Sequence, residues 1–419
     1  MNLLDELERR GAIADVTDRA ALDQLLSSGQ QNIYIGFDPT ADSLHVGSLL
    51  PALMLARFQR AGHRPIVLVG GATGMVGDPS GRSAERQLQT IESIRANVEG
   101  IKNQLARFFQ FDGHAAAIAV NNYDWTHSVS YLGFLRDVGK HFTVNHMLAK
   151  ESVRSRLEDR EHGISYTEFS YMLLQAFDFL HLFDKHACRI QGGGSDQWGN
   201  ITAGIELIRK KTGGQAFGIT FPLLTTSSGE KFGKSAGNAI WLDANKTSPY
   251  QFYQYWINTD DRDVERFLKL FTFLGLDQVA EIMEHPHEQR VAQKLLAAEV
   301  TRLVHGDEAL AQAEKASEVL FGGEVAGLTD QDLAEIFADV PSFEIDLATP
   351  VKITDALVRA GAAKSKGEAT RLVAGGGVYL NNHRVEAADT QIRREDRASE
   401  TMLILRVGKK SYYLGRVST

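Results

Sequence analysis

The sequence predicts an α/β protein built on a doubly wound parallel sheet, followed by an all-helical region and a small basic α+β module. Continuous apolar runs at residues 33–35, 65–69 and 116–120 alternate with helical patterns. Such runs are typical of strands that are buried on both faces of a parallel sheet. Helical periodicity continues from Ser248 to about Val340, and the chain becomes basic after residue 350.

Length and composition limit the class of protein. The chain has 419 residues, enough for two or three domains, with 43% hydrophobic and 23% charged residues. No apolar run approaches the roughly 20 residues of a membrane span, and the first residues lack the pattern of a signal peptide. The single cysteine, Cys188, excludes internal disulfides and a cysteine-cluster zinc site. We therefore expect a cytoplasmic protein with no membrane partner.

Charge is distributed unevenly along the chain. Residues 351–419 contain thirteen Lys or Arg against seven Asp or Glu, a net charge of +6. Since the whole chain carries −8, the first 350 residues carry −14. A basic module on an acidic body indicates contact with RNA or DNA. A solvated charged surface is the alternative interpretation.

The stretch from Ile33 to Leu50 predicts a strand, a turn and a helix that begins near His45. Asp38, Thr40 and Asp42 in the turn suit turns and helix N-caps. The start of a helix presents free backbone N–H groups and the positive end of a dipole, which together favour a phosphate group.

Two further glycine-rich loops follow predicted strands, at residues 70–78 and 192–199. In a doubly wound sheet, ligands lie where strands end, so residues 36–40 and 70–78 are expected at one site. No G-x-G-x-x-G follows a strand, which argues against a nicotinamide or flavin cofactor. The sequence GEKFGKS (residues 229–235) is one residue too short for a phosphate-binding Walker loop. It places Lys231 and Lys234 in a loop, where lysines are usually solvated but could close over a phosphate.

The helical pattern SYTEFSYMLLQAFDFLHLF places Tyr171, Gln175 and Asp178 on one face. Buried polar groups without partners cost about 1–3 kcal/mol each. These side chains therefore either bond to one another in the core or form a polar pocket for a small ligand.

The end of the chain is predicted to form a separate module. Residues 341–350, with two prolines and no periodicity, are expected to form a linker. Short helices are expected at Ile353–Ala360 and Ser365–Val373, followed by a hairpin in LILRVGKKSYYLGR.

Together these segments resemble the class I aminoacyl-tRNA synthetases, and among them the bacterial-type tyrosyl-tRNA synthetases. HVGS (His45–Ser48) is similar to the family's HIGH signature, and KFGKS (Lys231–Ser235) to its KMSKS signature. YIGFDPTADSLH, GGATGMVGDPSG, TEFSYMLLQAFDF and GGSDQWGNITAG are similar to tyrosyl-enzyme segments, in the same order. The resemblance covers essentially the whole chain, including a tail that is similar to a small RNA-binding module of a ribosomal protein.

The resemblance implies a division into domains. It implies a Rossmann-like catalytic domain at 1–223 with a helical connective insertion at about 123–186. The KMSKS-like loop and a helical anticodon-binding domain would occupy 224–340. The linker at 341–350 would lead to the RNA-binding module at 351–419. A homodimer is also implied.

The implied reaction activates L-tyrosine with ATP, giving tyrosyl-adenylate and pyrophosphate, and then transfers tyrosine to the 3′ end of tRNA(Tyr). Mg²⁺ would accompany ATP, with no zinc and no organic cofactor. The step needs positioning and charge stabilisation rather than a covalent intermediate. The implied catalytic residues, which would bind the phosphates in the transition state, are Thr40, His45, Lys231 and Lys234. Those implied for tyrosine binding are Tyr34, Asp78, Tyr171, Gln175, Asp178 and Gln197. Those implied for ATP binding are Gly36, Asp38, Gly47, Ser48, Gly194, Asp196 and Lys234. For tRNA they are Lys364, Lys366, Arg371, Lys409 and Lys410.

Both signatures depart from the family pattern. Ser48 replaces the second histidine of HIGH, so one neutral hydrogen bond to ATP is expected to change by about 1 kcal/mol or less. Phe–Gly replaces the Met–Ser of KMSKS, a variant typical of this subfamily.

Three alternative functions share parts of this pattern. A tryptophanyl-tRNA synthetase has the same fold, but Tyr34, Asp178 and the basic tail favour tyrosine. A non-catalytic RNA-binding protein on a synthetase scaffold would not need the intact signatures. A non-tRNA adenylyltransferase would need neither the helical region nor the tail.

Overall fold

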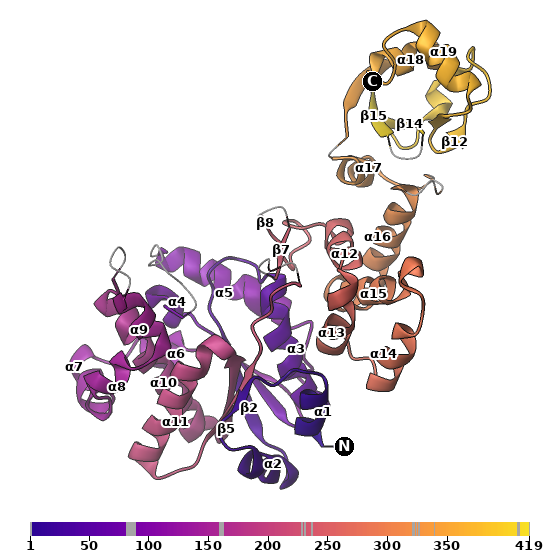
Figure 1. The fold of residues 1–419 in the computed structure, drawn as a ribbon. Coiled ribbons are helices and arrows are strands. Elements are labelled where there is room, and N and C mark those ends of the chain that lie inside the picture. Colours follow the sequence, from indigo (N-terminus) through magenta and orange to yellow (C-terminus); the bar gives the residue numbers. More distant parts are fainter. Residues whose placement is uncertain are drawn as a thin grey trace. The chain divides into compact units, whose positions relative to one another are not determined.

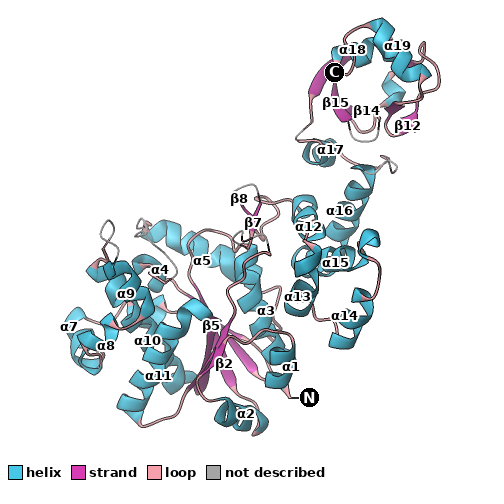
Figure 2. Ribbon diagram, in the orientation of Figure 1, coloured by secondary structure: helices cyan, strands magenta, loops and turns pink. Residues whose placement is uncertain are grey.

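The computed structural model describes most of the chain. The described residues are 2–80, 89–158, 163–227, 229, 232–235, 238–320, 323, 325, 327–338, 340–408 and 411–418. The chain divides into two compact units, residues 1–247 with 258–296 and residues 248–257 with 297–419. Figures 1 and 2 show the fold of each.

The first unit is built on a six-stranded sheet in the order β1-β6-β5-β2-β3-β4. Neighbouring strands from β6 to β4 pair in parallel, as the sequence predicts. Since β2 lies between β3 and β5, the chain changes direction across the sheet at the β2/β5 boundary. The strands are β1 (Asp15–Val16), β2 (Asn32–Phe37), β3 (Arg64–Val69), β4 (Ile118–Asn121), β5 (Cys188–Gly194) and β6 (Phe217–Phe221).

One edge of the sheet differs from the prediction. β1 pairs antiparallel with β6, so the sheet is mixed rather than wholly parallel. A two-residue strand has no apolar run of its own, and it is defined only by the hydrogen bonds that its partner supplies.

Helices cover both faces of this sheet (Figure 1). α10 and α11 pack together against one face, where Tyr34, Leu68 and Phe179 belong to one buried cluster, and α3 and α5 lie on the other. The helices are α1 (Leu3–Arg9), α2 (Arg19–Ser27), α3 (Val46–Arg60), α4 (Thr73–Val76), α5 (Ile91–Leu105), α6 (Tyr123–Thr126), α7 (Tyr131–Asp137), α8 (Val144–Leu148), α9 (Glu151–Glu158), α10 (Tyr166–His186), α11 (Trp198–Thr212), α13 (Asp261–Phe271) and α14 (Leu276–Met283).

The second unit combines helices with a five-stranded sheet in the order β12-β11-β14-β15-β9. A separate pair, β10 with β13, is antiparallel. Its helices are α12 (Pro249–Ile257), α16 (Asp307–Leu320), α17 (Asp330–Ile336), α18 (Ile353–Arg359) and α19 (Lys366–Ala374), while α15 (Val291–His305) has residues in both units. Its strands are β9 (Ser342–Asp346), β10 (Val351–Lys352), β11 (Val378–Leu380), β12 (His383–Arg384), β13 (Gln391–Ile392), β14 (Met402–Val407) and β15 (Ser411–Ser418).

The expected linker at 341–350 is wrong. Residues 342–346 form β9, which pairs in parallel with β15. Phe343 and Ile345 are buried while Ser342, Glu344 and Asp346 are exposed, because the other face of the strand meets solvent. The proline-rich ends of the segment concealed this short alternation.

The compact units also divide the predicted helical region. Residues 258–296, with α13 and α14, cluster with the six-stranded sheet, whereas α16 and α17 cluster with the C-terminal sheet. Leu333 and Phe337, in and just after α17, share a buried cluster with Met402 and Leu414 of that sheet. Among the described helices, none combines the length and apolar character that crossing a membrane requires.

Candidate active site

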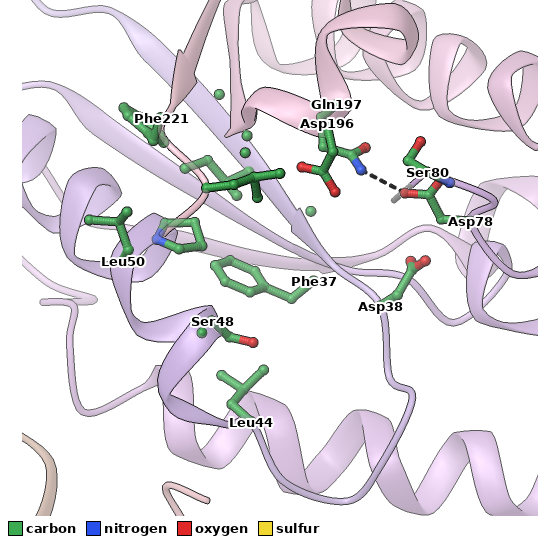
Figure 3. Close-up of a pocket in the computed structure, with 18 of the residues that line it drawn as sticks. Phe37, Asp38, Leu44, Ser48, Leu50, Asp78, Ser80, Asp196, Gln197 and Phe221 are labelled. Carbon is green, nitrogen blue, oxygen red and sulfur yellow. Dashed lines mark hydrogen bonds between the residues drawn. The ribbon is translucent and has the colours of Figure 1, made fainter. Parts of the chain in front are cut away.

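A cavity of about 1010 Å³ lies at the carboxyl ends of β2 and β5, at the change of direction in the sheet. Doubly wound sheets bind ligands at such points. Figure 3 shows carboxylates and an amide on one side of the cavity and apolar side chains with Ser48 on the other. Of the residues predicted from the sequence, the lining includes Tyr34, Gly36, Asp38, His45, Gly47, Ser48, Asp78, Tyr171, Gln175, Asp178, Gly194, Asp196 and Gln197.

The buried end of the cavity holds Tyr34 and Asp178. Tyr34 is 1% exposed, and its hydroxyl has no hydrogen-bond partner among the described residues. Its ring packs against Phe179 of α10. Burial, and then the nearby Asp178 carboxylate, raise the pKa of Tyr34 well above its usual range, so the hydroxyl remains protonated. A buried hydroxyl without a partner is costly, which indicates that a ligand supplies the partner.

Two residues that the sequence did not identify hold Asp178 in place. The Asn122 amide donates to one carboxylate oxygen at 2.9 Å, and the Trp125 indole N–H donates to the other at 2.8 Å. Burial raises the pKa of Asp178 to about 7, although both hydrogen bonds act in the opposite direction. The carboxylate is therefore oriented, and it is partly protonated near neutral pH.

Asp38 links the turn after β2 to the helix α10. The Tyr171 hydroxyl donates to Asp38 Oδ2 and the Thr73 hydroxyl donates to Oδ1, both at 2.8 Å. Asn122 also donates to the Thr73 hydroxyl at 3.0 Å. One continuous hydrogen-bond network therefore joins the two carboxylates Asp38 and Asp178.

A second polar group joins β5 to the loop after α4. The Gln197 amide donates to Asp78 Oδ2 at 2.6 Å (Figure 3), and the Ser80 backbone N–H donates to Oδ1 at 2.9 Å. Burial, and then the charge of Asp78, raise the pKa of Asp196. This side of the cavity is therefore rich in negative charge and suits a ligand with a positively charged group.

The HVGS signature (His45–Ser48) forms the first turn of α3. His45 is the N-cap, and its Nδ1 accepts the Gly47 N–H at 2.9 Å, which places the ring proton on Nε2. A side chain on Gly47 would collide with this ring, because its Cβ would lie 2.7 Å from Cε1. Glycine at this position therefore allows the cap to form.

Gly233, a described residue of the second signature (KFGKS, residues 231–235), lies next to the first signature, because a Cβ on Gly233 would be 3.3 Å from the Gly47 nitrogen. The Val46 N–H donates to the Ile240 carbonyl at 2.9 Å, and the Leu242 N–H donates to the Leu44 carbonyl at 2.8 Å. The segment after the second signature is thus joined to the start of α3 by an antiparallel bridge between His45 and Trp241, whose rings lie 6.3 Å apart.

Some predicted residues lie away from the cavity or outside the described part of the chain. Thr40 is exposed and is not part of the lining. Lys231, the side chain of Lys234, and Lys409 and Lys410 lie outside what the structure describes. Lys364, Lys366 and Arg371 are exposed on and beside α19. Within the described residues, no group of three or more His, Cys, Asp or Glu could hold a metal ion.

Sequence reasoning missed the residues that support the site. Asn122 and Trp125 follow the end of β4, where a doubly wound sheet places functional side chains, and this position was the available signal. Thr73 lies in a glycine-rich loop that the sequence did identify, but its partner Asp38 is 35 residues earlier.

A doubly wound sheet with two signatures meeting at its ligand-binding edge is the arrangement of a class I aminoacyl-tRNA synthetase. A family model described as tRNA synthetases class I (W and Y) matches residues 27–322, more than half of the chain, and the chain belongs to this family. A second model, the tyrosine--tRNA ligase SYY-like C-terminal domain, matches residues 332–415.

Within that family the chain belongs to the tyrosine–tRNA ligases. It is 52% identical to the tyrosine--tRNA ligase of Roseiflexus castenholzii and 53% identical to that of Listeria welshimeri, covering 99% of both chains in each case. Among solved structures, a C-terminally truncated mitochondrial tyrosyl-tRNA synthetase of Aspergillus nidulans is 36% identical with a TM-score of 0.69. That similarity covers 76% of this chain and 94% of the fungal one.

Proposed function

We propose that the protein is a tyrosine–tRNA ligase. The tyrosine carboxylate attacks the α-phosphorus of ATP, the bond from this phosphorus to the bridging oxygen breaks, and pyrophosphate leaves. A ribose hydroxyl at the 3′ end of tRNA(Tyr) then takes the tyrosyl group, and AMP leaves. Mg²⁺ accompanies the ATP phosphates.

The observation that carries this proposal is the pair at the buried end of the cavity. Tyr34 offers a hydroxyl without a partner, and Asp178 offers an oriented carboxylate. A substrate phenol can accept from the first and donate to the second. An indole has only an N–H donor and a phenyl ring has neither group, so each leaves a buried polar atom unpaired.

The other end of the amino acid fits the acidic side of the cavity. We assign the substrate ammonium group to Asp78, Tyr171 and Gln175, and the substrate carboxylate to the neighbourhood of Gln197. Asp78 is buried and already oriented by Gln197, which supports a role as a fixed negative charge. The reacting carboxylate would then lie towards the signatures.

We assign the ATP-binding end of the cavity to the region beside the start of α3. The Nε2–H of His45 and the positive end of the helix suit phosphate oxygens. We assign Thr40, Lys231 and Lys234 to the β- and γ-phosphates, where they bind the transition state more tightly than the ground state. Gly36, Asp38, Gly47, Ser48, Gly194 and Asp196 are assigned to the adenosine and ribose.

The remaining proposals concern tRNA and the domains. The catalytic region, the helical region and the C-terminal module would bind the acceptor end, the anticodon and further tRNA backbone respectively. Lys364, Lys366, Arg371, Lys409 and Lys410 would contact phosphates. A cytoplasmic location, where ATP and tRNA meet, is part of the same proposal.

Amino-acid-dependent ATP–pyrophosphate exchange tests the assignment. Tyrosine should support exchange, while tryptophan and phenylalanine should not at matched concentration. Exchange with tryptophan instead of tyrosine would identify a tryptophan-specific enzyme. A protein that exchanges with none of the three would refute the enzyme function.

We further propose a homodimer that uses the surface of α7, α8 and the start of α10. Large apolar side chains are exposed there, with Leu132 77% and Tyr131 and Tyr166 each 63% exposed. The Tyr131 and Tyr166 hydroxyls lie 3.4 Å apart, which joins α7 to α10 in one patch. Soluble monomers rarely expose such patches without a partner.

Sedimentation velocity tests the dimer. Leu132→Asp should give a monomer, whereas Phe111→Asp, at an exposed apolar residue on another segment, should leave the dimer intact. A monomeric wild-type protein, or a dimeric Leu132→Asp variant, would contradict the proposed surface.

A further inference from the structure

We propose that helix α13 positions the loop that carries the KFGKS signature. The side chains that do so are Asp263 and Arg266 together with the ring pair Phe267 and Phe271. The inference rests on the proposed function, because it assigns these residues an effect on the activation step.

The first contacts fasten the start of the loop. The Arg266 guanidinium donates to the Thr225 carbonyl at 2.7 Å, and the Ser227 backbone N–H donates to Asp263 Oδ2 at 2.8 Å. Arg266 also pairs with Asp263 Oδ1 at 2.9 Å, so the two anchors form one unit. Asp263 is 4% exposed, and a charge-assisted hydrogen bond shielded from water in this way is stronger than one at the surface.

The next contact fastens the loop inside the signature itself. Phe232 is 7% exposed, and its ring centroid lies 5.1 Å from those of both Phe267 and Phe271. It stacks on Phe271 and meets Phe267 edge-on, the two geometries that aromatic pairs favour. Phenylalanine in place of the methionine of KMSKS therefore has a structural role here as an anchor on α13.

The far side of the loop is fastened to the HVGS signature. The Ile240 N–H donates to the Gly233 carbonyl at 3.0 Å, and Ile240 in turn accepts from Val46. A Cβ on Gly233 would lie 3.3 Å from the Gly47 nitrogen, so the two signatures are in close contact at this point. The described residues of the loop are thus held between α13 and the first turn of α3.

α13 is itself fixed to α3 at its other end. The Arg57 guanidinium of α3 donates to the carbonyls of Lys269 and Thr272, at the end of α13, and Arg10 donates to the Lys269 and Leu274 carbonyls. α3 is therefore connected to α13 at both ends, through the loop at its first turn and directly through Arg57 in its last turn. The helix sets the separation of the two signatures, and reactions that depend on placed charges are sensitive to small errors in such distances.

The four α13 side chains act through the loop rather than on substrate. Among the described residues that line the cavity, Phe232 is present but Asp263, Arg266, Phe267 and Phe271 are not. They are positioning residues. Their loss should reduce the rate of activation and leave the tyrosine site unchanged.

The test is tyrosine-dependent ATP–pyrophosphate exchange on the full-length protein carrying Asp263→Ala. We expect kcat to fall by on the order of tenfold with the KM for tyrosine unchanged. Asp263→Asn keeps an oxygen that accepts the Ser227 N–H and should recover most of the rate. Arg262→Ala is the matched control, because Arg262 is on the same helix but pairs with Asp260 at the surface.

A second arm distinguishes positioning from a general loss of structure. Asp263→Ala should reduce kcat by a smaller factor in the Lys234→Ala variant than in the wild type, since both changes act on the same loop. Equal losses in the two backgrounds, or wild-type kcat for Asp263→Ala, would overturn the proposal. If Asp263→Ala does not fold, Arg266→Ala, on a half-exposed side chain, replaces it with the same expectations. A wild-type protein inactive with tyrosine would refute the proposed function instead.

Discussion

Replacing Tyr34 by phenylalanine removes a single oxygen atom from the buried end of the cavity. In the free protein this oxygen has no partner among the described residues and is almost wholly buried. An unpaired buried hydroxyl costs about 1–3 kcal/mol, so Tyr34→Phe should stabilise the free protein by an amount in that range. The ring contact with Phe179 is unaffected by the change.

The same substitution should weaken tyrosine binding. The substrate phenol would lose one neutral hydrogen bond, worth about 0.5–1.5 kcal/mol, or roughly a twofold to tenfold loss in kcat/KM. Phenylalanine would lose nothing, because it makes no such bond. The preference for tyrosine over phenylalanine should therefore fall by the same factor, while the stability of the free protein rises.

Two measurements on one variant test this reasoning. Urea unfolding without substrate gives the stability change, and pyrophosphate exchange with each amino acid gives the ratio of kcat/KM values. Opposite signs for stability and specificity are the expected result. A variant that is less stable, with an unchanged tyrosine-to-phenylalanine ratio, would mean that Tyr34 has a structural partner and does not contact the substrate.

Three other predictions follow from the same structure. Because burial raises the pKa of Asp178 to about 7 and the proposed acceptor is the carboxylate, kcat/KM for tyrosine should fall about tenfold per pH unit well below pH 7. Trp125→Phe removes a donor that lowers this pKa and should move the profile to higher pH; an unmoved profile would contradict the assignment. Because its pKa is raised, Asp178 binds a proton more tightly in the folded protein than in the unfolded chain. Protonation of Asp178 therefore stabilises the fold fully at pH values below the pKa of an aspartate in the unfolded chain. This stabilisation is lost as the pH rises through about 7. Arg57→Leu should cost about 1–3 kcal/mol in urea unfolding, because the Thr272 carbonyl at the end of α13 loses its guanidinium donor while Arg10 still donates to the Lys269 carbonyl; a cost near zero would show that water replaces the guanidinium. Removing the residues after Pro350 should give a protein that aggregates, because β9 loses its partner β15 and the apolar face of α17 is uncovered. Removing the residues after Leu320 should instead leave a soluble protein that forms tyrosyl-adenylate but does not charge tRNA. Equal solubility of the two truncations by gel filtration would argue against this packing.

Strands buried on both faces were predictable from the sequence, because a continuous apolar run can be recognised without knowing which strand it pairs with. β2 and β3 lie where the runs at residues 33–35 and 65–69 predict them, and β4 overlaps the run at residues 116–120. β1 and β9 were not predicted, since β1 is too short to carry a pattern and the alternation of β9 spans only five residues. The position of such a strand is determined by the neighbouring strand that it pairs with, and the local sequence does not reveal that strand.

The candidate site divides in the same way. Residues at the ends of strands, such as Gly36 and Asp38, could be placed from the order of the elements alone. Asn122 and Asp263 act through contacts with residues 56 and 36 positions away in the sequence, and local patterns contain no trace of such contacts. The sequence therefore identified side chains that face the cavity better than it identified those that hold them in position.

The parallel pairing of β9 with β15 has a consequence for how the C-terminal module is assembled. β15 lies between β14 and β9, yet it is synthesised after α18, α19 and β14. During translation β9 therefore emerges from the ribosome with its pairing edge open, and it stays unpaired until the last strand of the sheet is made. Strand edges of this kind promote association between chains. The alternation of Phe343 and Ile345 with the acidic residues Glu344 and Asp346 gives the waiting strand a charged face, which limits association between nascent chains.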